Sequence, residues 1–293
     1  MTALDIRRVH RKLADKPATA DHVRTVLHAV LETARMEELI DSNPATVVKR
    51  FAKPPKRRRA LTLDELARLG AVLDEVEETG TVNLTDENGN TKTYGVDSAA
   101  ALTLRLLALT GMRKSELLGH HAKARRGPRE GLRWGDIDLD AGTYELAAHG
   151  GGSGGKGGDP RRLPLGRGTV ELLRGLRPDD VDLDAPVVPS PRTPAQCYNG
   201  LNKARRHIYQ AAVLEGVDAD SLRHSFESIA FSIAPAFAGA LTGRAFTRDA
   251  TLNSYLHADE NELRSVADQV AGRIAQAMAG ELADVVPIEQ ARR

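Results

Sequence analysis

Apolar residues recur at helical spacing near the start of the chain. Over residues 21–40 they form one stripe opposite a polar face, which predicts an amphipathic helix. The stripe consists of Val23, Val26, Leu27, Val30, Leu31 and Ala34. A shorter helix is expected at 3–15, and Pro17 separates the two. Asn43-Pro44 ends the pattern.

A second series of elements begins at a helix-start signal. Thr62-Leu63-Asp64-Glu65 is a capping box, and Gly80 can close the helix that it opens. Asn88-Gly89 between threonine-rich flanks predicts an exposed hairpin. An Ala- and Leu-rich helix is expected over 97–109.

The pattern alternates between strand-like and helical segments further along the chain. A basic stretch over 120–129 has the composition of a surface insertion. Short strands are expected at 133–139, 143–148 and 161–165, and helices at 168–177, 194–214 and from 221 to beyond 270. The fold class is therefore mainly α with a small antiparallel β-sheet, an α+β arrangement.

A strongly basic segment divides the chain. Seven of the eleven residues from 49 to 59 are cationic, and Pro54-Pro55 stiffens the segment: the cations are Lys49, Arg50, Lys53, Lys56, Arg57, Arg58 and Arg59. We expect a helical lobe over 1–47, an exposed linker over 48–60 and a larger domain over 61–293. The linker either tracks a phosphate backbone, which its position between two folded pieces favours, or is only a solvated charge run.

Composition narrows the class of protein. The 293 residues are 28% charged and 41% hydrophobic, and the net charge is only +1. No apolar run approaches the ~20 residues that span a bilayer, and no signal-peptide core is present, so we expect a cytoplasmic protein without a membrane partner. The single Cys197 excludes an intrachain disulfide, and the histidines lack metal-ligand spacing, so neither a metal nor a cofactor is expected.

Three motifs far apart in sequence carry the chemistry. Thr110-Gly111-Met112-Arg113-Lys114-Ser115-Glu116 comes first, Leu222-Arg223-His224 follows, and Tyr255 stands 32 residues after Arg223. Lys156 lies in a glycine-rich turn eight residues before Pro164 of a Leu-Pro-Leu strand. This order and spacing resemble the tyrosine recombinase (phage-type integrase) family over roughly residues 20–275.

The resemblance implies a role for each of these residues. Arg113 and Arg223 would hold the scissile phosphate, Lys156 would be the general acid and Tyr255 the nucleophile. Glu116 and His224 would support the arginines. Two positions depart from the family pattern. Asp220 stands where a histidine or lysine is usual, and Arg244 stands where a histidine or tryptophan is usual.

Each residue also has a simpler interpretation. Arg113 could be a surface arginine paired with Glu116, Arg223 an exposed structural arginine, and Tyr255 a half-buried core tyrosine. Lys156 could sit in a merely flexible turn. The glycine run from 150 to 158 also approximates nucleotide-binding patterns, but a strand-like segment follows it where those patterns need a helix, so nucleotide binding is not expected.

The resemblance implies cleavage and rejoining of double-stranded DNA through a 3′-phosphotyrosyl intermediate, by a homotetramer assembled on DNA. Whether accessory DNA-bending proteins take part remains open. Two alternatives also remain open: a catalytically impaired relative that binds without cutting, and a helical protein-interaction scaffold.

The lobe over 1–47 has about two helices, fewer than the family's usual core-binding domain, so either the start is truncated or the lobe is minimal. The apolar stripe of residues 260–279 is expected to dock on a neighbouring protomer, with folding back on its own domain as the alternative.

Overall fold

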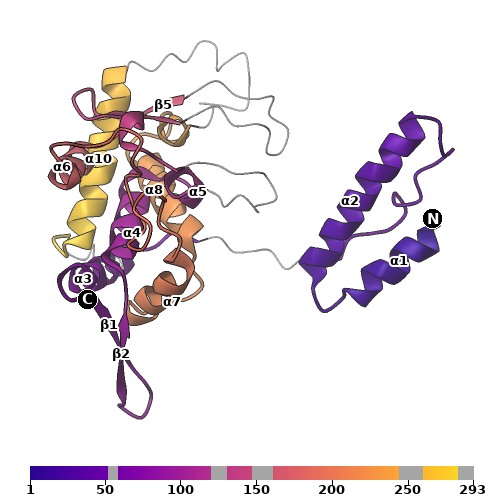
Figure 1. The fold of residues 1–293 in the computed structure, drawn as a ribbon, viewed down its shortest axis with the longest axis horizontal. Coiled ribbons are helices and arrows are strands. Elements are labelled where there is room, and N and C mark those ends of the chain that lie inside the picture. Colours follow the sequence, from indigo (N-terminus) through magenta and orange to yellow (C-terminus); the bar gives the residue numbers. More distant parts are fainter. Residues whose placement is uncertain (52–58, 120–130, 147–160, 244–259, 283–293) are drawn as a thin grey trace, which may run out of the picture. The chain divides into compact units, whose positions relative to one another are not determined.

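The computed structural model describes residues 1–51, 59–119, 131–146, 161–243 and 260–282. The chain divides into two compact units, Met1–Arg57 and Arg58–Arg293. Figure 1 shows the elements of both. Lys53, Lys56, Arg57, Arg58, Lys156, Arg244 and Tyr255 lie outside the described residues.

The first unit is a pair of helices. α1 (Ala3–Lys12) begins at a capping box in which the Thr2 side chain accepts from the Asp5 main chain and the Asp5 side chain accepts in return. α2 (Pro17–Met36) has Pro17 in its first turn, where the missing N–H needs no helical partner. The predicted helix over 21–40 is therefore shifted about four residues toward the N-terminus.

A small core holds the first unit together. Ile6 of α1 packs with Ala45 and Val48, and Leu27 and Leu31 of α2 cover them. A buried polar contact lies beside this core, where His10 Nε2 is 3.0 Å from Asp21 Oδ1. The His10 ring stacks on Phe51 at 4.1 Å between centroids. The segment after α2 is thereby fastened back onto both helices.

The second unit is built around a buried helix. α3 (Leu63–Thr79) opens with the predicted Thr62–Glu65 capping box and closes at Gly80, whose φ of 68° suits glycine. α4 (Ser98–Thr110) is apolar on nearly every side and packs against α3, α7 (Leu201–Ala211), α8 (Ala219–Ile233) and α10 (Glu260–Met278). The short α5 (Lys114–Leu117) follows it, and α6 (Arg167–Leu176) packs against α10.

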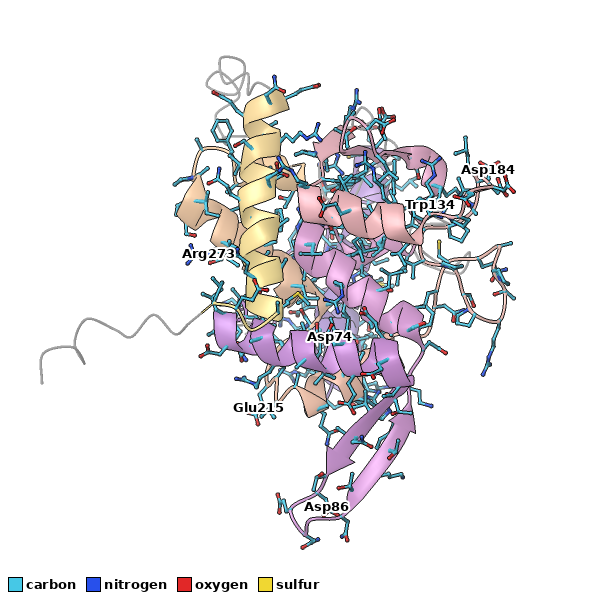
Figure 2. All side chains as sticks on the ribbon, turned by 90° about the vertical axis from the view of Figure 1, so that its left-hand side faces the viewer. Asp74, Asp86, Trp134, Asp184, Glu215 and Arg273 are labelled. Atoms are coloured by element: carbon cyan, nitrogen blue, oxygen red, sulfur yellow. The ribbon has the colours of Figure 1, made fainter. Side chains whose placement is uncertain are left out.

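Two small antiparallel sheets accompany these helices. β1 (Thr81–Thr85) and β2 (Thr91–Gly95) form the predicted hairpin, with Asp86 near its tip, which extends beyond the helices (Figure 2). The other sheet has the order β3 (Ile137–Asp138), β4 (Thr143–Leu146), β5 (Arg161–Pro164), preceded by the 3-10 turn η1 (Trp134–Asp136). Tyr144 lies opposite Leu163 in this sheet. The mainly α fold with small antiparallel sheets is confirmed.

Two further predicted helix boundaries are wrong. α7 begins at Leu201 and not near 194, because Pro194 and Gly200 lie in the expected first turns and the chain forms a bridge between Pro189 and Cys197 instead. α8 ends at Ile233, since Pro235 cannot donate a helical hydrogen bond and restricts Ala234 before it. A second turn, η2 (Ala240–Thr242), follows α8 and ends at Gly243.

The C-terminal stripe packs within its own unit. Val266, Val270, Ile274 and Met278 of α10 are all buried in the main core. The end of α10 lies against α3 (Figure 2). A Cβ at Gly70 would lie 1.9 Å from the Met278 carbonyl oxygen, so only glycine fits at this contact. The prediction that this stripe docks on a neighbour is therefore wrong, because an amphipathic stripe shows that a helix is covered but not by which chain.

Candidate active site

Arg113 is placed by the turn that ends α4. Gly111 has a φ of 63°, and a Cβ there would lie 2.6 Å from the Phe226 ring, so both backbone and space call for glycine. The turn delivers Arg113 to the N-cap position of α5. Its side chain is 45% exposed, which leaves it accessible from solvent.

Glu116 is a buried carboxylate among three guanidinium groups. Its Oε2 accepts from the main-chain N–H of Arg113 (2.8 Å), and its Oε1 accepts from Arg113 Nη1 (2.9 Å). Nη2 of Arg161 lies 3.6 Å from Oε1, and Nη1 of Arg223 lies 3.7 Å from Oε2. The pairing of Arg113 with Glu116 is thus present, but it belongs to a larger cluster and is more than a surface contact.

Arg223 is held inside the protein. It is 4% exposed, so the alternative of an exposed structural arginine is wrong. Leu222 and Phe226 flank it in the core, as their spacing predicted. Its Nη1 donates to the Gly111 carbonyl (2.8 Å), its Nη2 to the Thr242 carbonyl (3.0 Å) and its Nε to Glu227 Oε1 (3.0 Å).

Arg161 joins this cluster and was missed in the sequence. It comes from β5, and its Nη1 donates to the Gly243 carbonyl at 2.6 Å. A strand places alternate side chains on the same face, so the buried Leu163 implies that Arg161 also faces inward and that Arg162 faces outward. Arg162 indeed bonds the Thr143 hydroxyl near the surface. Strand alternation was therefore the signal that could have found Arg161.

Tyr144 is buried beside the cluster. Burial raises the pKa of its phenol far above the ordinary value, and the nearby Glu116 carboxylate raises it further. A phenol that resists ionisation and is closed to solvent is a poor nucleophile for DNA. Tyr144 is therefore part of the core of the second unit.

The remaining predicted residues on α8 have different surroundings. Asp220 is exposed in the first turn, three positions before Arg223. His224 is partly exposed, and its Nδ1 lies 3.7 Å from Glu227 Oε2. The structure thus brings together Arg113, Glu116 and Arg223 with His224 nearby, while the positions of Lys156, Arg244 and Tyr255 are not described.

The basic segment is divided between the two units. Lys49 is exposed in the first, where Arg50 Nη2 lies 3.4 Å from the Thr25 hydroxyl. Arg59 belongs to the second, and its two terminal nitrogens donate to the two oxygens of Glu65 at 2.6 Å each. Arg59 also donates to the Glu215 carbonyl. Its role in DNA binding stays a prediction, and the geometry gives it a structural role as well.

The described residues also bear on metal binding and on membrane insertion. They contain no group of three or more His, Cys, Asp or Glu side chains placed to hold a metal ion. None of the helices in these ranges is long and apolar enough to cross a membrane.

Known proteins resemble this chain in sequence and in fold. No family model matches it. It is 27% identical over 248 residues to the tyrosine recombinase XerC of Xanthomonas campestris pv. campestris, an alignment that covers 83% of this chain and 64% of the relative. The chain therefore spans less than two thirds of the length of the curated relatives it matches.

Solved structures of lambda integrase share the fold. A lambda integrase dimer bound to a COC′ core site aligns at 17% identity with a TM-score of 0.52, covering 88% of this chain and 82% of that one. A lambda integrase tetramer bound to a Holliday junction aligns at 18% identity with a TM-score of 0.54, covering 85% of this chain and 65% of that one. The chain is thus similar in sequence to named tyrosine recombinases and in fold to lambda integrase, and it brings Arg113, Glu116 and Arg223 together.

Proposed function

We propose that the chain is a site-specific recombinase that cleaves and rejoins double-stranded DNA through a 3′-phosphotyrosyl link to Tyr255. The observation that carries the proposal is the meeting of Arg113 and Arg223, more than a hundred positions apart, on the buried Glu116. Relatives named as tyrosine recombinases support it.

The arginine cluster suits the charge that develops when a phosphodiester is cleaved. Attack by an oxygen nucleophile builds negative charge on the nonbridging oxygens, and planar guanidinium groups can hold those oxygens through paired hydrogen bonds. Donors fixed in advance by the fold need no reorganisation during reaction, and removing one typically costs about 10²–10³ in rate. Arg113, 45% exposed, and the fixed Arg223 are the proposed donors.

Two further steps complete the proposed reaction. As the Tyr255 oxygen bonds to the phosphorus, the phenol proton passes to solvent and the bond to the 5′-oxygen breaks, and the Lys156 ammonium gives a proton to that 5′-oxygen. The phosphotyrosyl bond keeps the free energy of the broken phosphodiester, so a 5′-hydroxyl can reverse the step without ATP. The lambda integrase structures on a core site and as a tetramer on a Holliday junction suggest duplex DNA and a homotetramer as the assembly. Accessory DNA-bending proteins are not required by this scheme.

A second candidate is a relative that binds DNA without cutting it. Asp220 favours it, because an exposed carboxylate one helical turn before Arg223 would repel a phosphate held there. Both candidates require DNA binding, and only the first requires a covalent intermediate.

The test is covalent trapping. Duplexes that bind the full chain are selected from a random pool, and the bound sequence is rebuilt with a nick near the cleavage site, so that a short fragment diffuses away after cleavage. Recombinase activity predicts a protein–DNA band that survives denaturing electrophoresis and is lost in Tyr255→Phe. Binding without such a band would favour the second candidate, and no salt-dependent binding would favour an interaction scaffold.

A further inference from the structure

Glu227 stands one helical turn after Arg223 on α8 and is bonded to it directly. Its Oε1 accepts from Arg223 Nε at 3.0 Å and from the Thr242 hydroxyl at 3.2 Å. Its side chain is 16% exposed. Neither the sequence motifs nor the comparisons give this carboxylate a role.

Three hydrogen bonds fix both the position and the plane of the Arg223 guanidinium. A guanidinium presents five N–H groups in a rigid planar fork, so acceptors on Nε and on both terminal nitrogens leave it no rotation. Two of these acceptors are the carbonyls of Gly111 and Thr242, and the third is the Glu227 carboxylate, while the Glu116 carboxylate lies 3.7 Å from Nη1. A carboxylate acceptor makes a hydrogen bond about twice as strong as a neutral one.

Glu227 also connects Arg223 to the turn η2. Thr242 contributes its carbonyl to Arg223 and its hydroxyl to Glu227, so the arginine, the carboxylate and the turn form a closed ring of contacts. Gly243, next in the chain, is held by Arg161. The segment that carries Tyr255 leaves from this turn.

The negative charge of Glu227 has an opposing effect. A carboxylate bonded to Arg223 offsets part of the positive charge that would attract a phosphate. Its net benefit must therefore come from orientation, since on charge alone the protein would bind DNA better without it.

We propose that Glu227 is a positioning residue, which sets the plane of the Arg223 guanidinium through Nε and ties it to the Thr242 turn. The proposal rests on the proposed function. Two variants distinguish the acceptor oxygen of Glu227 from its charge. Glu227→Gln keeps an oxygen that can accept from Nε but loses the charge, whereas Glu227→Ala loses both.

Single-turnover cleavage of the nicked duplex tests the catalytic consequence. Glu227→Ala is expected to lower the cleavage rate about tenfold to a hundredfold, as a small misplacement of a reacting group does, while DNA affinity stays equal or rises. Glu227→Gln is expected to restore most of that rate. Glu78→Ala is the matched control, because it removes the same charge from an exposed position on α3; its cleavage rate should equal that of the unaltered chain.

The guanidinium itself gives a readout that needs no cleavage. In protein labelled with ¹⁵N-arginine, the Nε–H resonance of Arg223, identified by its loss in Arg223→Lys, should be shifted and protected from exchange. It should remain so in Glu227→Gln and lose protection in Glu227→Ala. Should Glu227→Ala fail to fold, Thr242→Val removes the hydroxyl and keeps the carbonyl, and it should show a smaller loss of the same kind.

Three results would overturn the proposal. They are a wild-type cleavage rate in Glu227→Ala, a rate in Glu227→Gln as low as in Glu227→Ala, and an Arg223 resonance that none of the variants changes. If the unaltered chain forms no covalent adduct, the proposed function fails separately, and the resonance still decides whether Glu227 fixes the guanidinium.

Discussion

Glu116 is the residue on which the arginine cluster depends. It is 3% exposed and lies near the guanidinium groups of Arg113, Arg161 and Arg223. Because Arg223 is also buried, loss of this carboxylate would leave a buried positive charge with less compensation.

We predict that Glu116→Ala lowers the free energy of unfolding of the second unit by about 3–5 kcal/mol, the usual cost of breaking a buried ion pair from one side. Urea unfolding followed by circular dichroism measures it. The exposed Glu78→Ala should change the same quantity by less than about 0.5 kcal/mol. Equal effects of the two variants would mean that Glu116 does not organise the cluster.

Other residue-scale features could be predicted only in part. Arg113, Glu116 and Arg223 were found because motifs mark them, and their meeting point followed from the family resemblance. Arg161 was missed although its alternation with Leu163 was readable. Glu227 could not be predicted, because its contact depends on where the Thr242 turn packs, which no local pattern encodes.

At the scale of elements, the start of α3 contains a carboxyl, Glu65, through which the stability of the second unit depends on pH. The hydrogen bonds from Arg59 hold the pKa of the Glu65 carboxyl below its ordinary value of 4.5, and the Thr62 main-chain N–H lowers it further. A group whose pKa is lower in the folded state contributes stability above its unfolded pKa, and this contribution is lost as pH falls through the folded pKa.

We therefore predict that Glu65→Gln destabilises the second unit at neutral pH and much less in acid. Above pH 5 the free energy of unfolding should fall by about 1 kcal/mol. This value is small for a hydrogen bond between charged groups because the Arg59 side chain is 38% exposed. It should shrink as pH falls below 4.5. Unfolding curves at several pH values measure it, and a difference that does not vary with pH would contradict the assignment.

The helix α10 gives a second prediction at this scale. Ile274 is fully buried in the core of its own unit, so Ile274→Ala should lower the free energy of unfolding by about 2–5 kcal/mol. Arg273→Ala, next to it and exposed, is the control in the same urea experiment. An effect no larger than that of the control would mean that α10 leaves this core in solution.

The ends of these helices could be predicted better than their packing partners, because local residues set the ends. The Thr62 capping box and Gly80 bound α3 as expected, because both act through hydrogen bonds within a few residues. The end of α8 before Pro235 is set by an equally local effect. The partner of the α10 stripe could not be predicted, since any apolar surface would satisfy it.

At the scale of the whole molecule, the proposed function requires DNA affinity that depends on salt. Neutralising one phosphate contributes about −0.9 to the slope of log K against log salt. Arg59 is engaged by Glu65, so the better test changes Lys53, Lys56, Arg57 and Arg58 to Ala. We predict a slope flatter by up to about three to four units.

Binding of a selected duplex at several salt concentrations measures this slope. Changing the exposed Lys92 and Arg192, far from that segment in sequence, is the control for general loss of positive charge. An unchanged slope in the fourfold variant would mean that the basic segment is only a solvated charge run.

The proposed attachment of DNA to Tyr255 is tested by identifying the residue that carries the DNA. The trapped complex is digested with nuclease and trypsin, and the modified peptide is sequenced by mass spectrometry. We predict a phosphotyrosyl nucleotide on Tyr255, in the tryptic peptide 249–264. No such peptide is expected from Arg223→Ala, which lacks a phosphate-binding guanidinium. A nucleotide on any other residue, or an adduct that forms equally without Arg223, would contradict the prediction.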